Sequence, residues 1–184
     1  MANTARTVAL AVALVSLAGP HVSAHAQEIR PTLAPPSHVR SRSPSITSVI
    51  QQAGERSATF RRLIETINAS TSYVYVDEGE CRDSDERGCL VNVTVAGPYR
   101  FVFVHVATGK ADWDLMGSIG HELRHSVEVI DNPSVTSLRT MRSLYEWIGK
   151  QNFRNPNAYE TDAAIADGDA VRNEVRAFIR RGKP

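Results

Sequence analysis

The sequence predicts an α+β domain: a small antiparallel sheet with an N-terminal helix before it and three C-terminal helices after it. Two observations predict this class. Apolar residues recur at helical spacing before residue 68 and after residue 112, and three runs rich in valine and aromatic residues lie between them. Helices and strands are thus segregated along the chain instead of alternating, which is typical of α+β folds. With 184 residues, 42% of them hydrophobic, the chain is long enough for one such domain.

Residues 1–26 are expected to form a secretory signal peptide. Arg6 precedes an apolar run, Val8–Ala18, which Gly19–Pro20 ends, and small residues allow cleavage after Ala26. This run has 11 residues, whereas a membrane-spanning helix needs about 20. The mature protein is therefore expected to be secreted or periplasmic, with no membrane span.

The next segment, residues 27–44, contains four prolines among serines and arginines, and we expect an extended linker there. The folded domain is then predicted to span residues 45–184. Helical spacing runs from Ile46 to Ile67, and Gly54 is expected to divide it into two pieces.

The predicted strands cover Ser72–Asp77, Leu90–Ala96 and Tyr99–Ala107. Gly97–Pro98 predicts a tight turn between the second and the third.

Cys81 and Cys89 are the only two cysteines, and they flank a polar loop between predicted strands. Export permits a disulfide, which would staple this hairpin. Two free thiols are the alternative, and the spacing is not the short one of a zinc knuckle.

Three helices are expected in the C-terminal part. The first begins with Asp112 as N-cap and ends near Ile130, because Asp131–Pro133 stops it. The second is predicted over Ser134–Lys150 and the third over Ala158–Arg180.

The first of these helices contains the pattern H-E-x-x-H at residues 121–125. Four helical residues advance about 400°, so the imidazoles of His121 and His125 lie on one face, one turn apart, and can bind one metal ion. Glu122 points about 100° away from His121, where it can act as general base toward a metal-activated water. Zn²⁺ suits this set because it accepts imidazole nitrogen. The ordinary alternative is a pair of surface histidines that fit the pattern by chance.

A third protein ligand is needed, and Glu160 is the better candidate. Glu128 lies about 7.5 Å further along the helix than the midpoint of the two histidines, so it is expected to support His125 or to form a surface salt bridge instead of binding the metal. Glu160 is expected at the start of the last helix, and small residues behind it, Ala163 and Ala164, would allow close helix approach. The alternative for Glu160 is an acid that complements the helix dipole. Asp162 or Asp167 would then orient a ligating imidazole.

His121–His125, followed by a downstream glutamate before small residues, resembles the zincin metalloproteases, in particular the glutamate-liganded gluzincins. The resemblance implies that His121, His125 and Glu160 bind zinc and that Glu122 is the general base. It also implies a tyrosine or histidine that stabilises the reaction intermediate, for which Tyr159 is the candidate and Tyr145 its rival. The ordinary alternative for each is a tyrosine at the edge of the core. Family members place substrate along an edge strand, which would here be Tyr99–Ala107.

The charge balance, 21 basic against 20 acidic residues, argues against a nucleic-acid partner. The expected function is therefore that of an exported zinc peptidase acting on a peptide or protein. A non-catalytic zinc-bound module of the cell envelope is the main alternative, and an exported domain without metal is the third. The sequence does not indicate an oligomeric state.

Overall fold

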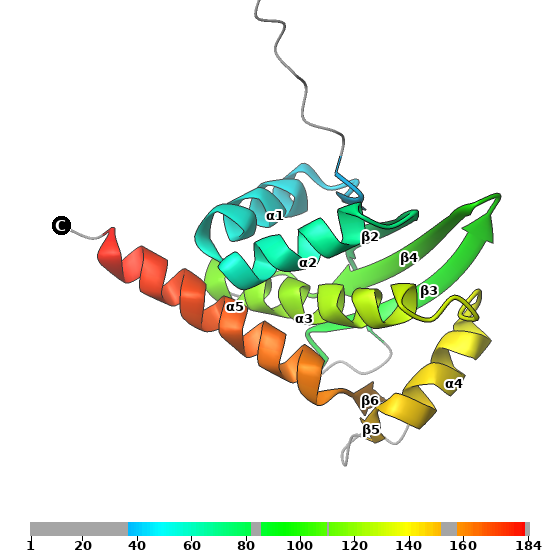
Figure 1. The fold of residues 1–184 in the computed structure, drawn as a ribbon. Helices are drawn as coiled ribbons and strands as arrows, with labels where there is room; N and C mark the ends of the chain where they lie inside the picture. The colour runs from blue at the N-terminus through cyan, green and yellow to red at the C-terminus, as the bar shows by residue number, and fades with distance from the viewer. Residues whose placement is uncertain (1–36, 82–85, 110, 152–157, 183–184) are drawn as a thin grey trace, which may run out of the picture. The chain divides into compact units, whose positions relative to one another are not determined.

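The predicted α+β class is confirmed by the computed structural model, which describes residues 37–81, 86–109, 111–151 and 158–182 (Figure 1). The predicted signal peptide lies outside the described residues, as does most of the predicted linker. None of the described helices is long and apolar enough to cross a membrane. The elements in chain order are β1 (Val39–Arg40), α1 (Pro44–Arg56), α2 (Ala58–Asn68), β2 (Ser72–Glu78), β3 (Gly88–Ala96), β4 (Tyr99–Val106), α3 (Asp112–Ile130), α4 (Leu138–Ile148), β5 (Lys150–Gln151), β6 (Tyr159–Glu160) and α5 (Asp162–Arg181).

The two N-terminal helices are separated at Ser57, and Gly54 lies inside α1. Ser57 has extended backbone angles, and its hydroxyl accepts a hydrogen bond from the backbone N–H of Phe60. A serine N-cap satisfies a donor that the helix itself leaves unpaired. The cap that starts α2, and not the glycine, therefore sets the boundary.

The main sheet is mixed, with strand order β1-β2-β4-β3, and is not purely antiparallel as predicted. Within this sheet, only β3 and β4 pair antiparallel among the described strands, and they are joined through Gly97, whose φ is 59°. Strands β5 and β6 form a separate antiparallel pair. The chain passes from β2 to the edge strand β3 and returns through β4, which inserts between them parallel to β2. Val39–Arg40, which the sequence analysis placed in the linker, adds β1 parallel to β2. Such pairings depend on distant partners, so local alternation does not specify them.

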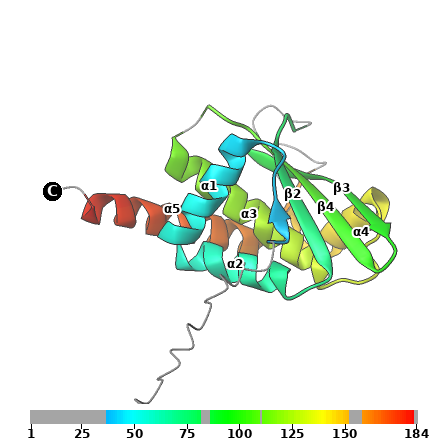
Figure 2. The same ribbon diagram turned by 90° about the horizontal axis from the view of Figure 1, so that it is seen from above.

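One face of this sheet packs against the helices. Side chains that alternate along the strands, such as Val74, Val102 and Val104, are buried together with Phe60 of α2. Figure 2 shows β2, β4 and β3 side by side, with α3 crossing behind them. The apolar stripe of α3 faces this core, as the sequence predicts; its members are Leu115, Ile119, Leu123 and Val127.

Helix α5 lies directly against α3 because glycines remove side chains between them (Figure 1). A Cβ at Gly120 would lie 2.8 Å from Cγ2 of Val171, and a Cβ at Gly168 would lie 3.0 Å from Cβ of His121. From the sequence, this close approach was expected at Ala163 and Ala164, and Ala164 is fully buried. Gly120 and Gly168 provide the contact at the turn of α3 that carries His121.

Three helix starts differ from those predicted. Helix α3 begins with Asp112 as its first helical residue, after Ala111. Helix α4 begins later than expected because Ser137 and Thr140 form a capping box. Helix α5 starts only at Asp162, with Thr161 as its N-cap. Glu160 consequently lies in strand β6 and not in the last helix.

Candidate metal centre

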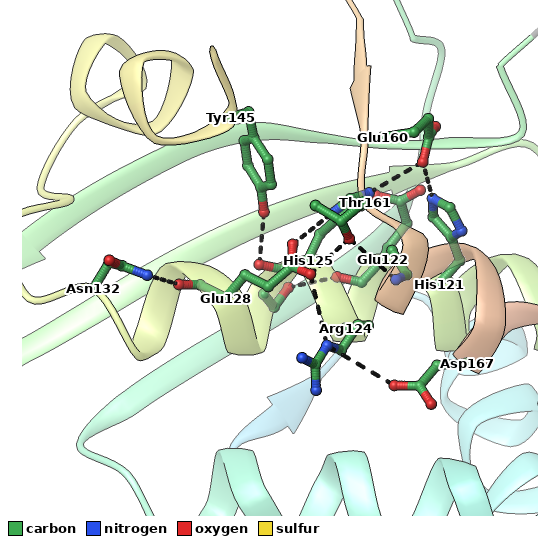
Figure 3. A network of polar contacts seen from close by, with 12 residues as sticks. His121, Glu122, Arg124, His125, Glu128, Asn132, Tyr145, Glu160, Thr161 and Asp167 are labelled. Atoms are coloured by element: carbon green, nitrogen blue, oxygen red, sulfur yellow. Dashed lines mark hydrogen bonds and ion pairs between the residues drawn. The ribbon is translucent and has the colours of Figure 1, made fainter. Parts of the chain in front are cut away.

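The structure brings His121, His125 and Glu160 together at the junction of α3 and β6 (Figure 3). Oε2 of Glu160 lies 2.9 Å from Nε2 of His121 and 3.4 Å from Nε2 of His125. The two imidazole rings stand almost perpendicular, with centroids 4.8 Å apart. All three ligand atoms lie within 4.8 Å of one another. One atom from each residue therefore faces a common point.

This donor set fits zinc. Tetrahedral coordination with zinc–ligand bonds of about 2.0–2.1 Å separates neighbouring ligand atoms by roughly 3.3 Å. The Glu160–His125 distance of 3.4 Å agrees with that value, whereas the Glu160–His121 distance of 2.9 Å is that of a hydrogen bond and would lengthen around an ion. Two imidazoles and one carboxylate are also a usual protein set for a catalytic zinc that keeps one position open.

The opposite ring nitrogen of His125 is held by Glu128. Nδ1 of His125 lies 2.9 Å from Oε2 of Glu128, and Nε of Arg124 lies 3.6 Å from Oε1 of the same carboxylate, so both contacts considered for Glu128 are present. The hydroxyl of Thr161 donates to Oε1 of the same carboxylate at 2.7 Å. These hydrogen bonds connect His125 through Glu128 to Thr161 (Figure 3). Because Thr161 follows Glu160 directly in the chain, they tie His125 to the segment that carries Glu160.

The ionisable groups of the centre perturb one another. Burial opposes the charged form of His125, but hydrogen bonds to Glu128 and Glu160 outweigh it and raise its pKa to about 10. Burial also opposes ionisation of Glu160, yet the same kind of bonds from His121 and His125 lower its pKa to about 2. The three side chains are thus matched as hydrogen-bonding partners. A divalent cation would compete with a proton for His125.

Glu122 is buried next to this centre and lies against the start of β3. Burial raises the pKa of its carboxyl group, against the opposing influence of His125 and His121. A Cβ on Gly88 would lie 2.8 Å from both Cγ and Oε1 of Glu122. Glycine at position 88 therefore leaves the space that the Glu122 carboxylate occupies.

Neither predicted aspartate contacts an imidazole, which corrects the expectation for both. The Asp162 carboxylate is exposed and binds Nζ of Lys150 at 2.6 Å, because α5 begins with this residue on its outer side. Asp167 lies 4.0 Å from Nε of Arg124, which in turn is 3.6 Å from Oε1 of Glu128.

The two candidate tyrosines have different surroundings. Tyr145 donates its hydroxyl to the backbone carbonyl of His125 at 2.8 Å, and burial raises its pKa. This hydroxyl is thus engaged in holding α4 against α3. Tyr159 lies in β6 next to Glu160 and lines the larger of two cavities that adjoin the centre.

The predicted disulfide between Cys81 and Cys89 is confirmed, with Cα atoms 6.0 Å apart. It closes the segment that leads into β3. The strand Tyr99–Val106, expected to lie at the edge of the sheet, is instead interior, and β3 is the edge strand beside the centre.

Residues that the sequence analysis did not assign to the site also contribute. They are Thr161, Gly88, and the arginines Arg87 and Arg172, which line a smaller cavity together with His121 and Glu122. Thr161 had a usable signal, because a threonine followed by acidic and small residues is a common helix start. The others have no local signature, since they reach the site through tertiary contacts.

Comparison of the chain with protein-family models, with curated proteins and with solved structures finds no match. The resemblance to zincins therefore remains an expectation carried by the motif at residues 121–125.

Proposed function

We propose that this protein is an exported zinc-dependent peptidase with its active site at His121, His125 and Glu160. The observation that carries the proposal is the convergence of Nε2 of both histidines on Oε2 of Glu160, beside a buried glutamate. The disulfide supports export, because such bonds persist in oxidising compartments.

Bound zinc would act as a Lewis acid that lowers the pKa of water and polarises a peptide carbonyl. Glu122 accepts the proton of the attacking water and passes it to the leaving amine nitrogen. Its raised pKa suits this exchange, because a base with a pKa closer to neutrality both takes and returns a proton. Glu128 orients His125, and Tyr159 is the candidate donor to the developing oxyanion.

Substrate binding is proposed along β3, whose outer edge borders the larger cavity, of about 830 Å³. An extended peptide can add to an exposed strand edge through backbone hydrogen bonds. Leu90 and Val91 of this strand line the cavity together with Met141 and Tyr145. Apolar side chains of a substrate would be buried there.

Metal analysis of the purified protein, combined with cleavage of a peptide library, tests the proposal. One zinc per chain and hydrolysis are expected for the wild type. Glu122→Gln should retain zinc and lose at least 10²-fold in kcat, whereas His121→Ala should lose zinc as well. Full activity of Glu122→Gln would contradict the mechanism. Stoichiometric zinc without hydrolysis of any peptide would favour the non-catalytic module instead.

A further inference from the structure

The start of β3 contacts α3 at two separate points beside the candidate metal centre. Gly88, the first residue of β3, lies against Glu122, since a Cβ at position 88 would be 2.8 Å from Oε1 of that carboxylate. Its neighbour Arg87 reaches the first turn of α3, where Nη1 lies 2.6 Å from each oxygen of Asp114. The two contact points on α3 are about 12 Å apart along the helix axis.

Asp114 is a fixed anchor for this segment. Its side chain is only 9% exposed, whereas that of Arg87 is 52% exposed. Nε of Arg172, on α5, lies 3.1 Å from Oδ1 of the same carboxylate. A Cβ at Gly117 would lie 2.1 Å from Cγ of Arg172, so glycine at that position leaves room for the arginine stem. The Asp114 carboxylate is thus held between α3 and α5, and Arg87 attaches the start of β3 to it.

Two further contacts tie this segment to its own sheet. The backbone N–H of Ala107 donates to the carbonyl of Arg87 at 3.0 Å, and the disulfide closes the segment that leads into β3. Neither contact involves α3, so neither by itself fixes the separation of Gly88 from Glu122. The Arg87–Asp114 ion pair joins the segment to the helix that carries Glu122, and it can fix that separation.

We propose that Arg87 and Asp114 are positioning residues for the general base Glu122. The inference rests on the proposed peptidase function. The ion pair holds Gly88 against the Glu122 carboxylate and so confines this carboxylate to one orientation beside the two histidines. A base must stay within hydrogen-bond reach of the proton that it accepts, and a displacement of about 1 Å is enough to slow the reaction strongly.

Steady-state kinetics of zinc-loaded Arg87→Gln test the proposal. We expect kcat to fall at least about tenfold while KM and zinc content stay at their wild-type values, because only the placement of the base changes. Arg87→Lys keeps a cation for the Asp114 carboxylate and should recover most of the lost kcat. Asp114→Asn removes the pair from its other side and should reproduce the loss. Thermal melting reports whether each variant is folded.

The chain offers a matched control at the opposite edge of the sheet from β3. Arg42 follows β1, and its Nε lies 2.7 Å from Oδ2 of Asp77. This pair also joins an exposed arginine to an aspartate with little exposure, with side chains 80% and 11% exposed. Arg42→Gln therefore removes a similar ion pair, and it should leave kcat unchanged.

Amide hydrogen exchange gives a second readout that needs no substrate. The N–H of Ala107 is protected by the carbonyl of Arg87. Its exchange should become about tenfold faster in Arg87→Gln, because the acceptor segment is no longer attached to α3. It should stay at the wild-type rate in Arg42→Gln.

Wild-type kcat in both Arg87→Gln and Asp114→Asn would overturn the proposal, even if exchange became faster, because the pair would then be purely structural. An equal loss of kcat in Arg42→Gln would overturn it too. Combined with Gly88→Ala, Arg87→Gln should cause no further loss, since both act through Glu122. If the zinc-loaded wild type cleaves no peptide, the peptidase proposal itself fails, and this is seen before any variant is measured.

Discussion

Thr161 and Glu128, which are 33 residues apart in the chain, are joined by a 2.7 Å hydrogen bond from the threonine hydroxyl to the carboxylate. The same threonine hydroxyl accepts from the backbone N–H of Ala164 and so caps α5. Glu128 meanwhile holds Nδ1 of His125. The Thr161 side chain therefore caps the start of α5 and, through Glu128, supports the orientation of His125. Because Thr161 follows Glu160 directly, the same contact also fixes the end of β6 next to the histidines.

Replacing Thr161 with alanine is expected to weaken zinc binding by roughly tenfold, because partners of metal ligands orient them. Competition with a chromogenic chelator measures this affinity. Thr161→Ser keeps the hydroxyl and should bind as the wild type does. Ser137→Ala removes the cap of α4 and should cost about 1 kcal/mol of stability without changing zinc affinity. Unchanged affinity in Thr161→Ala would show that the Glu128 contact does not support the metal.

Gly88→Ala is expected to displace the Glu122 carboxylate, since the new Cβ would lie 2.8 Å from it. We expect kcat to fall at least tenfold, with zinc affinity retained, because a small misplacement of a base slows proton transfer strongly. Steady-state kinetics and zinc titration separate the two effects. In a Glu122→Gln background, Gly88→Ala should cause no further loss, since both act through one group. An additive loss would assign Gly88 another role.

Gly120→Leu should separate α3 from α5, because its side chain would collide with Val171. Overpacking of this kind costs about 1–3 kcal/mol. Zinc affinity should fall too, since α5 and β6 carry Glu160 to the histidines. Urea unfolding and zinc titration are the measurements. Gly54→Leu is the matched control, because a Cβ at position 54 meets no atom within 4 Å. Neither the free energy of unfolding nor the zinc affinity should fall in this variant.

Stability should decline in acid through Glu174 of α5, whose carboxylate accepts hydrogen bonds from the start of α2. Burial raises its pKa, but hydrogen bonds from Ser57 and Thr59 outweigh burial and lower it below the ordinary value of 4.5. A depressed folded-state pKa stabilises the protein above about pH 4.5, and that contribution is lost as the pH falls through the folded-state value.

Glu174→Gln is therefore expected to cost about 1 kcal/mol near neutral pH, and the difference from the wild type should narrow at about pH 3. Urea unfolding of the wild type and of Glu174→Gln, near neutral pH and at about pH 3, measures this difference in stability. Glu55→Gln, which removes an exposed glutamate from α1, should change stability little at either pH. A cost for Glu174→Gln that does not depend on pH would mean that the carboxylate charge is not involved.

Local patterns in the sequence were enough to predict most helices and the β-rich middle of the chain. The apolar stripe of α3 and its end at Ile130 agree with the prediction because both depend on spacing within about 20 residues. The sheet order was not predictable in this way. Whether β4 lies inside the sheet or at its edge depends on pairing with residues of β2 that lie 28 positions earlier in the chain.

The sequence by itself determined which chemistry is available: two imidazoles one helical turn apart, a glutamate between them, and a disulfide pair. Helical periodicity is sufficient to align His121 with His125, because both belong to one rigid element. Only the tertiary structure decided that Glu160 reaches them from a short strand, held by Thr161 and Glu128. The packing of α5 on the glycines of α3 also brought Arg172 to Asp114, because close approach of two helices depends on the side chains of both.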